Sequence, residues 1–348
     1  MNQNTSLRME HPHLPSDSNR EIWAPLADLI AAHDRFLISS HIRPDGDAIG
    51  SALAMRRLLE RLGKDAVCVM DEDPGRMYEC FNSPGEIQIL DSQVPSFAGR
   101  EVMVMVDAGE WYRLGRAGDV MRQHPGPKIC IDHHIPQNEF HGLKIVDVHS
   151  PSTTVMIYRF LRYLDMELAF DLAEPIYLGL IVDTQNFHLP NTTEESHYIA
   201  AECLRAGVRP DRVHKPVYGT LRFARIRLLS QAFSNLEVHF QGKVALMYTT
   251  RAMFEAYGAD ESDDDGFVDL VKAVEGVRAG VYLREEKDKT VKISWRTVGN
   301  NSVVEAAHRF GGGGHKQAAG ATIAGDIESV KNIVLTDLEQ RIARGEIT

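Results

Sequence analysis

The chain has 348 residues, 43% of them hydrophobic and 25% charged, which is enough to build two globular domains of ordinary size. Its formal net charge of −11 argues against an enzyme that follows long duplex nucleic acid over a broad basic surface, because phosphate neutralisation dominates such binding. No apolar run approaches the ~20 residues of a membrane span, and the first twenty residues lack the apolar stretch of a signal peptide, so we expect a cytoplasmic protein with no membrane partner.

The hydrophobic pattern of residues 21–210 alternates between strands and helices. Strands are expected at residues 35–39, 66–70, 86–90, 102–106, 128–131 and 143–146. Helices are expected at residues 23–34, 48–62, 153–164, 172–184 and 194–206. This order predicts an α/β fold with a doubly wound, mostly parallel sheet. The α/β region is preceded by a polar segment, residues 1–20, that we interpret as a flexible tail.

A second, smaller domain is expected after residue 210. Residues 211–236 carry apolar side chains at helical spacing with arginines between them, and we interpret them as one connecting helix. Residues 237–348 then predict a smaller α/β domain, with strands at 242–249, 276–283 and 291–296 and a helix at 302–310. The acidic run at residues 260–266 lacks the ligand order of a calcium loop, so we interpret it as a solvated turn.

The four cysteines of the chain are scattered and form no CxxC pair: Cys68, Cys80, Cys130 and Cys203. Two of them lie in apolar, strand-like runs, which favours reduced thiols that pack in a core. We therefore give the cysteines no function.

Four short polar segments follow expected strands or helices of the first domain. In chain order they contribute His41, Asp45 and Asp47, then Asp107, then Asp132, His133 and His134, then Asp183. Ligands collect beyond the carboxyl ends of strands in open α/β sheets, so these side chains are expected to converge. A buried carboxylate is costly unless it is paired or bound to a cation. The set predicts a site for two metal ions about 4 Å apart, with one carboxylate bridging them.

The first polar segment lies between a strand and a helix, and Gly46 would permit a sharp bend there. The free N–H groups of the helix near Gly50 and Ser51 could also receive a phosphate oxygen. The segment alone leaves an alternative open, in which Asp45 and Asp47 only form turns and cap the helix.

Together these segments resemble the DHH phosphoesterase superfamily, whose name comes from the triplet seen here at residues 132–134. The resemblance covers the run HIRPDGDAIGS at residues 41–51, the strand-end Asp107 and the helix-end Asp183. It implies an N-terminal metal-binding catalytic domain over residues 21–210.

The resemblance continues in the second domain, residues 237–348. Residues 310–320, FGGGGHKQAAG, look like the glycine-rich signature of the associated DHHA1 domain. Residues 294–297, SWRT, resemble that domain's SxRS substrate strand, with Thr297 keeping the hydroxyl of the last serine. The second domain is thus expected to bind substrate.

The resemblance also implies roles for individual residues. One metal ion would be held by His41 and Asp45 and the other by Asp47, His133 and Asp183, with Asp107 bridging. Oxygen and imidazole ligands without a thiolate suit two Mn²⁺ ions, with Mg²⁺ or Co²⁺ as alternatives. Asp132 would orient an imidazole, and His134 would face the phosphoryl group.

Substrate contacts are expected from both domains. Glycines can present N–H groups to a phosphate, and basic side chains add charge-assisted hydrogen bonds. The residues concerned are Arg113, Ser294, Arg296, Gly313, Gly314 and His315. Arg113 lies in the first domain, and the sequence leaves two interpretations of it open: a phosphate clamp or an ordinary surface arginine.

The length and domain organisation of the chain distinguish between members of the superfamily. A family II pyrophosphatase has a different second domain, and RecJ-type exonucleases are longer and carry an added nucleic-acid module. The remaining resemblance is to compact oligoribonucleases (nanoRNases) that also dephosphorylate 3′-phosphoadenosine 5′-phosphate (pAp), which implies hydrolysis of short RNA to mononucleotides. A phosphodiesterase for cyclic di-AMP or linear dinucleotides stays open as an alternative, as does a regulatory module that holds metal and nucleotide without turnover. The oligomeric state, a homodimer included, is also left open.

Overall fold

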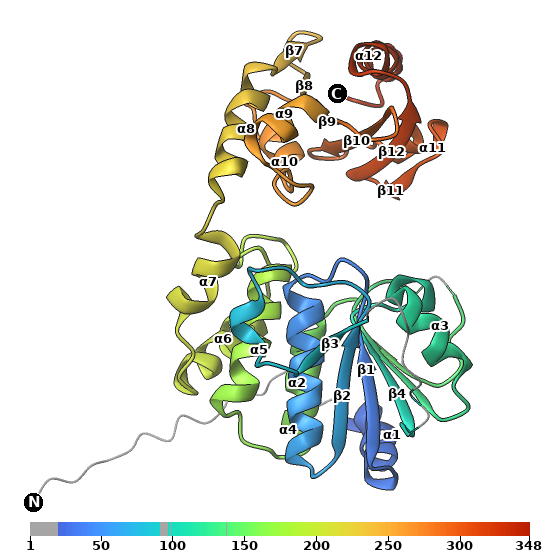
Figure 1. Cartoon of the computed structure of the whole chain (residues 1–348), viewed down its shortest axis with the longest axis vertical. Helices are drawn as coiled ribbons and strands as arrows, with labels where there is room; N and C mark the ends of the chain where they lie inside the picture. The colour runs from blue at the N-terminus through green and yellow to red at the C-terminus, as the bar shows by residue number, and fades with distance from the viewer. Residues whose placement is uncertain (1–19, 91–96, 98, 137) are drawn as a thin grey trace, which may run out of the picture. The chain divides into compact units, whose positions relative to one another are not determined.

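The computed structural model describes residues 20–90, 97, 99–136 and 138–348, so nearly all of the predicted tail lies outside the described residues. The chain divides into two compact units, Met1–Thr220 and Leu221–Thr348. Each unit contains a sheet with helices packed on it (Figure 1). None of the described helices is long and apolar enough to cross a membrane.

The first unit is built on a six-stranded parallel sheet. Its strands are β1 (Arg35–Ser39), β2 (Asp65–Met70), β3 (Ile87–Ile89), β4 (Val102–Val106), β5 (Lys128–Asp132) and β6 (Leu143–Val146). They lie in the order β3-β2-β1-β4-β5-β6, and every pairing is parallel. The order reverses between β1 and β4, which is the place where open α/β sheets form a ligand-binding crevice. The predicted doubly wound α/β fold is confirmed.

Helices cover both faces of this sheet. They are α1 (Arg20–Ala32), α2 (Gly46–Arg61), α3 (Arg116–Gln123), α4 (Thr153–Tyr163), α5 (Phe170–Asp183), α6 (Glu194–Arg205) and α7 (Pro210–Tyr218), with 3₁₀ turns η2 (Glu79–Phe81) and η3 (Trp111–Leu114). Side chains alternate along a strand, so Phe36 and Ile38 of β1 join the core under α1, α2 and α4, whereas Leu37 packs with Met121 of α3. Burial on both faces explains why the strands read as apolar runs.

Helices α2 and α5 pack closely because glycines lie in their contact. A side-chain carbon at Gly46 would overlap Val182, and one at Gly50 would overlap the carbonyl oxygen of Pro175. Gly46 is the first residue of α2 and has no positive φ. The prediction that Gly46 permits a bend is therefore wrong, since close packing on α5 is what requires a glycine there.

The predicted connecting helix over residues 211–236 is two helices in the structure, α7 and α8 (Phe223–Ser234). Gly219 ends α7, and its N–H donates to the carbonyl of His214. Arg222 precedes the first turn of α8. The prediction of a single helix is wrong because apolar residues continue at helical spacing on both sides of the break and hide it.

The second unit has a six-stranded mixed sheet. Its strands are β7 (Glu237–His239), β8 (Val244–Thr249), β9 (Ala279–Glu285), β10 (Thr290–Thr297), β11 (Gly313–His315) and β12 (Ala318–Ala324), in the order β11-β12-β10-β9-β8-β7. The β8–β9 pair is parallel and the other pairs are antiparallel.

Helices also cover this second sheet on both faces. They are α8, α9 (Arg251–Tyr257), α10 (Phe267–Lys272), α11 (Val304–Arg309) and α12 (Ile327–Ala343). Residues of α11 and α12 pack around Trp295 on one face, and residues of α8, α9 and α10 pack around Phe267 on the other. The predicted second, smaller α/β domain is confirmed.

The acidic run at residues 260–266 binds arginines. Arg222 donates hydrogen bonds to Asp260 and Asp263. Asp264 is buried and lies 3.0 Å from Nη1 of Arg284. The predicted solvated turn is confirmed for the exposed residues of this run, but it is wrong for Asp263 and Asp264, which are buried and pair with Arg222 and Arg284.

Candidate metal centre

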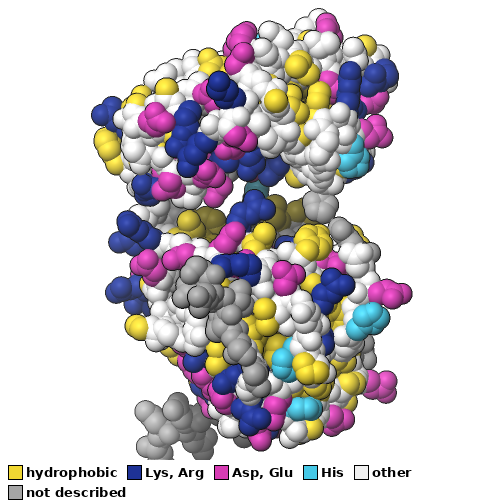
Figure 2. Space-filling model, turned by 45° about the vertical axis from the view of Figure 1, so that its right-hand side comes forward, with side chains coloured by type: hydrophobic (Ala, Val, Ile, Leu, Met, Phe, Trp, Pro, Cys, Tyr) yellow, Lys and Arg dark blue, Asp and Glu magenta, His cyan; other side chains and the backbone are white. Residues whose placement is uncertain are grey.

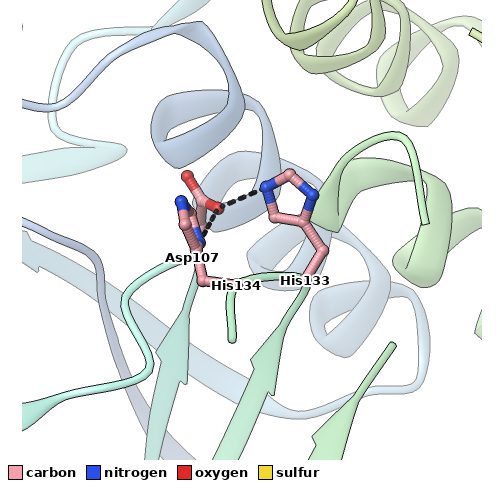
Figure 3. Close-up of side chains that lie close together, drawn as sticks. All are labelled: Asp107, His133 and His134. Carbon is pink, nitrogen blue, oxygen red and sulfur yellow. Dashed lines mark ion pairs between the residues drawn. The ribbon is translucent and has the colours of Figure 1, made fainter. Parts of the chain in front are cut away.

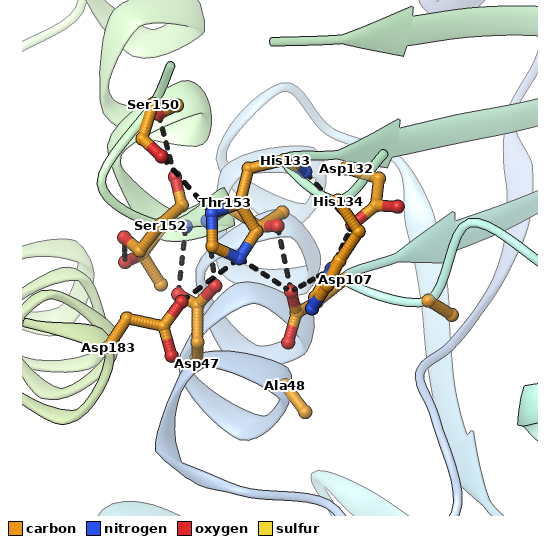
Figure 4. Close-up of polar contacts among 12 residues, drawn as sticks. Asp47, Ala48, Asp107, Asp132, His133, His134, Ser150, Ser152, Thr153 and Asp183 are labelled. Atoms are coloured by element: carbon orange, nitrogen blue, oxygen red, sulfur yellow. Dashed lines mark hydrogen bonds and ion pairs between the residues drawn. The ribbon is translucent and has the colours of Figure 1, made fainter. Parts of the chain in front are cut away.

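Three of the four polar segments begin at the carboxyl ends of adjacent strands. His41 follows β1, Asp107 follows β4 and Asp132 ends β5, and these strands are neighbours in the sheet. The fourth segment supplies Asp183, the last residue of α5. Figure 4 shows His133 and Asp183 pointing toward one another over the start of α2. The candidate centre therefore lies where the strand order reverses, as the predicted fold requires.

Asp107 lies at the middle of this centre. Its side chain is 1% exposed, and its carboxylate lies 3.5 Å from Nε2 of His41, 3.6 Å from Nε2 of His133 and 3.7 Å from Nδ1 of His134. Figure 3 shows both His133 and His134 reaching Asp107 from the end of β5. The φ angle of Asp107 is 55°, a left-handed conformation that costs a residue with a side chain about 1–2 kcal/mol and persists where the surroundings enforce it.

The six expected metal ligands form two groups. The first is His41, Asp45 and Asp107, and the second is Asp47, His133 and Asp183. Within each group the candidate donor atoms lie within 4.8 Å of one another. Oδ2 of Asp107 faces His41, whereas Oδ1 faces His133, whose Nε2 also lies 3.0 Å from Asp183. The two oxygens of Asp107 thus face different ligand groups, which is the geometry of a bridging carboxylate.

Two histidines present Nε2 to the carboxylates. Nδ1 of His41 donates to the carbonyl of Ile42 at 2.8 Å, and Nδ1 of His133 donates to the carbonyl of Ser150 at 3.1 Å. A carbonyl oxygen only accepts hydrogen bonds, so Nδ1 carries the proton and Nε2 of the neutral ring keeps its lone pair. Metal-binding histidines are usually held in this way.

The segment at the start of α4 completes the centre, although the sequence did not predict this role for it. Asp47 accepts hydrogen bonds from the backbone N–H groups of Thr153 at 2.7 Å and Thr154 at 3.0 Å, so its carboxylate lies at the N-terminus of α4. The hydroxyl of Thr153 donates to Asp107 at 3.0 Å (Figure 4). The only sequence signal was the run SPSTT at residues 150–154, small polar residues before an expected helix.

Asp45 caps α2 as well as lying in the first ligand group, whereas Asp47 makes no cap. Oδ1 of Asp45 accepts hydrogen bonds from the backbone N–H groups of Asp47 and Ala48 and caps α2. Gly50 and Ser51 are buried inside α2, where their N–H groups belong to the helix. The prediction that N–H groups near Gly50 and Ser51 receive a phosphate is therefore wrong.

Asp132 orients His134. Oδ1 of the buried Asp132 accepts hydrogen bonds from Nδ1 of His134 at 2.8 Å and from the backbone N–H of His133 at 2.9 Å. The side chain of His134 is 44% exposed, so its ring, with Nε2 outside this hydrogen bond, is accessible. Gly109 makes room for the arrangement, because a side-chain carbon there would overlap Oδ2 of Asp132.

Arg113 of η3 lies beside the first group. Its Nη1 donates to the carbonyl of Ala108 at 3.1 Å, and its own carbonyl accepts from the N–H of Ile42. Burial lowers the pKa of His41. The negative charge of Asp45 raises this pKa in part, and the positive charge of Arg113 lowers it. Arg113 therefore lies close to the ligand His41, and its role as a phosphate clamp stays a prediction.

Buried negative charge makes this centre suitable for cations. Among the described residues, no lysine or arginine forms an ion pair with Asp47, Asp107 or Asp183. Burial, and then the charge of Asp47, raise the pKa of both Asp107 and Asp183. Burial lowers the pKa of His133, but its hydrogen bond to Asp183 and the charge of Asp47 outweigh this and raise it to about 9. Carboxylate oxygens and imidazole nitrogens without a thiolate fit Mn²⁺ or Mg²⁺.

Without metal, we expect the free energy of unfolding to fall as the pH rises. Asp107, Asp183 and His133 hold their protons more tightly in the folded chain, so their contribution is complete below the unfolded pKa and is lost as the pH passes the folded pKa. For His133 the window runs from 6.5 to about 9. Thermal unfolding in a chelator between about pH 6 and pH 9 checks this, and added Mn²⁺ should remove the trend. A metal-free protein that gains stability over this range would contradict it.

Comparison with known proteins identifies the family. Residues 35–180 match the DHH family, N-terminal domain, and residues 243–344 match the DHHA1 domain. The chain is 34% identical to the bifunctional oligoribonuclease and PAP phosphatase NrnA of Thermus thermophilus, over 91% of this chain and 93% of that protein. The chain belongs to the DHH family.

A second curated protein and a solved structure are also similar to this DHH chain. The cyclic-di-AMP phosphodiesterase PdeA of Listeria monocytogenes is 25% identical over 93% of this chain, which spans 49% of that protein. The crystal structure of an exopolyphosphatase-related protein from Bacteroides fragilis has a TM-score of 0.86 and 26% identity, covering 92% of this chain and 96% of that one.

In the DHHA1 domain, the expected substrate strand is β10. Burial alternates along it, so that Ser294 and Arg296 lie on the face opposite Trp295, the face on which Tyr282 and α10 also lie. Their partners in β12 are Gly320 and Ala318, so no bulky side chain of β12 stands beside Ser294 and Arg296 on this face. Thr297 is buried on the other face, and its hydroxyl donates to the backbone carbonyl of Asn301 at 2.9 Å.

The glycine run of the DHHA1 domain forms β11. A side-chain carbon at Gly312 or Gly314 would overlap the backbone of β12, so the strand pairing requires glycine at both positions. At Gly313 it would meet no atom within 4 Å, and the backbone there is not left-handed. The packing within the described part of this domain therefore does not require a glycine at Gly313. The side chain of His315 lies outside the described part of the chain.

Proposed function

We propose that this chain is a metal-dependent phosphoesterase that hydrolyses short oligoribonucleotides to mononucleotides and removes the 3′-phosphate of pAp. The observation that carries the proposal is the division of ligands between the two oxygens of Asp107. A pair of divalent cations bridged in this way suits displacement at phosphorus. The choice of short RNA and pAp is supported by similarity over nearly the whole chain to a relative named for both activities.

Two Mn²⁺ ions are the proposed cofactors, with Mg²⁺ or Co²⁺ as alternatives. His41, Asp45 and Asp107 would hold one, and Asp47, His133 and Asp183 the other. When bound, the pair supplies a Lewis acid to the phosphoryl oxygens and activates a water for attack on phosphorus. The backbone N–H groups at the start of α4 and the hydroxyl of Thr153 fix the carboxylates of Asp47 and Asp107 before the ligand arrives.

His134 is the proposed catalytic residue beside the metal ligands. Its Nδ1 is engaged by Asp132, so Nε2 is the atom left to meet the phosphoryl group. When protonated, Nε2 donates a hydrogen bond to an oxygen on which negative charge develops. Arg113, which is held by the carbonyl of Ala108, would add a second donor. Asp132 acts only through His134, by holding its ring in place.

We propose residues 21–210 as the catalytic domain and residues 237–348 as the substrate-binding domain. In the latter, Ser294, Arg296, Gly313, Gly314 and His315 are the proposed contacts with the substrate. Arg296 is held with its Nη1 on the carbonyl of Trp295 and its Nε 3.7 Å from Asp269. It therefore presents a charge from a fixed position to an anionic ligand.

Replacing Gly313 with alanine tests this recognition surface. The fold has room for the methyl group, so the melting temperature should not change. The methyl group should obstruct substrate and lower kcat/KM about ten-fold, equivalent to about 1.4 kcal/mol. Gly99→Ala is the matched control, because Gly99 also has open space around it and lies in the other unit. Unchanged kcat/KM in Gly313→Ala would remove Gly313 from the proposed contacts.

The charge of the chain supports a short substrate, and a cytoplasmic location is part of the proposal. On the face drawn in Figure 2, Lys and Arg side chains are interspersed with Asp and Glu on both units, in keeping with the net charge of −11. Long duplexes need extended positive surface, so we exclude them from the proposed substrates. A homodimer is left as a proposal for light scattering to test.

Purified protein with Mn²⁺ should be given pAp, the dinucleotide pApA and cyclic di-AMP side by side. Release of phosphate from pAp and of mononucleotide from pApA is the expected result. The main alternative is a cyclic dinucleotide phosphodiesterase, favoured by the similarity to PdeA across 93% of this chain, and faster turnover of cyclic di-AMP would establish it. Tight nucleotide binding with no product from any of the three would show a regulatory module instead.

A further inference from the structure

A turn with an unusual backbone directly follows Asp183. Gln185, Asn186 and Phe187 have φ angles of 45°, 57° and 63°. Side chains disfavour this left-handed region, and three such residues in succession are exceptional outside glycine. The turn is anchored on α5, because the N–H of Asn186 donates to the carbonyl of Ile181 at 2.7 Å.

Packing explains only one of these three side chains. Phe187 stacks on His197 with ring centroids 4.9 Å apart and packs against the core. Gln185 and Asn186 are exposed, and neither side chain makes a hydrogen bond within the described part of the chain. Two carboxamides are therefore held beside the metal centre at a cost to stability that glycine would avoid.

Tyr218 of α7 shares the anchor of this turn. Its hydroxyl donates at 3.3 Å to the carbonyl of Ile181, the same oxygen that accepts from the N–H of Asn186. Tyr218 is 37% exposed, and α7 lies against α5 in the first unit (Figure 1). Burial and then the negative charges of Asp183 and Asp45 raise the pKa of Tyr218 to about 12.

We propose that Tyr218, Gln185 and Asn186 form the subsite for the nucleobase next to the scissile phosphate. An aromatic ring stacks on any base, and the two carboxamides supply the donors and acceptors that match a base edge. The inference rests on the proposed function, because a phosphoryl group at the metal centre is what brings the base to this side of Asp183.

Glycine variants separate recognition from structure. Gln185→Gly and Asn186→Gly should each keep or raise the melting temperature, by about 2–4 °C if the strain is fully relieved. Each should nevertheless raise KM for pAp about ten-fold with a smaller change in kcat, since a lost hydrogen bond to the base weakens binding. The matched control is Lys289→Gly, an exposed residue with a φ of 61° in the other unit, which should gain stability without any change in KM.

Tyrosine variants test the stacking. Tyr218→Phe keeps the ring and should behave like the wild type, whereas Tyr218→Ala should raise KM for pAp ten-fold or more. Ribose 3,5-bisphosphate carries the same phosphates without a base, and its KM should be alike for wild type and all variants. Phe170→Ala, at the other end of α5, removes an exposed aromatic ring as a control and should leave both KM values unchanged.

Binding of adenosine 5′-monophosphate in Mn²⁺ provides a readout that does not depend on turnover. A dissociation constant raised about ten-fold in Tyr218→Ala and in Gln185→Gly is expected. Equal affinity in wild type and variants, or equal loss with the base-free substrate, would overturn the subsite. If the wild type binds the nucleotide through Tyr218 but releases no product from any substrate, the proposed function fails while the subsite stands.

Discussion

The Asp107→Asn protein is expected to lose turnover and, when free of metal, to be more stable than the wild type. Asparagine keeps the shape of the side chain and can accept the hydrogen bond from Thr153, but it cannot bring negative charge to two cations. Without the bridging carboxylate, kcat/KM should fall by about 10³-fold or more, equivalent to about 4 kcal/mol. The free energy of unfolding in a chelator should rise by about 1–2 kcal/mol near neutral pH, since the variant removes a carboxyl group whose pKa burial raises.

Urea unfolding with and without Mn²⁺, beside the substrate assay, measures both effects. Mn²⁺ should stabilise the wild type and leave Asp107→Asn unchanged. Asp119→Asn, an exposed carboxylate on α3, is the control and should alter neither stability nor turnover. A variant that still hydrolyses substrate at the wild-type rate, or that is less stable than the wild type without metal, would show that Asp107 is not the shared carboxylate.

The second large effect is expected at Gly179, which is not a ligand. A methyl group there would overlap Oδ1 of Asp47 and the side chain of Thr154, so alanine must move α5 or displace the carboxylate. Such overpacking typically costs about 1–3 kcal/mol of stability. Displacement of Asp47 should lower kcat/KM about 10²-fold, because small errors in positioning are costly to catalysis.

The concentration of Mn²⁺ needed for half-maximal activity tells these two effects apart. It should rise in Gly179→Ala, because the second ligand group loses its geometry, and remain normal in Gly99→Ala, where the methyl group has room. A folded Gly179→Ala protein with the wild-type requirement for Mn²⁺ would mean that Asp47 is not a ligand.

The ligands could be predicted from the sequence because local patterns mark the ends of strands and helices. Asp107 ends a run of five apolar residues that can only be a buried strand, and the triplet at residues 132–134 ends another. Parallel pairing then brings such ends together without further information. The division of the ligands into two groups came from the family resemblance rather than from any such pattern.

What could not be predicted depends on contacts between distant parts of the chain. The backbone N–H of Thr153 donates to Asp47, 106 residues away in the chain, and no local sequence pattern predicts such a pair. The glycines in the α2–α5 contact have the same origin, since the close approach of Gly46 and Gly50 to α5 exists only in three dimensions. Helix α3 was missed because its eight residues bury only a few small or flexible side chains, too few to show a helical period.

Crystals grown with Mn²⁺ and measured at the manganese absorption edge test the metal centre most directly. Two anomalous peaks about 4 Å apart are expected, one between His41 and Oδ2 of Asp107 and the other between His133 and Asp183. A single peak, or peaks away from both oxygens of Asp107, would contradict a shared carboxylate between two cations.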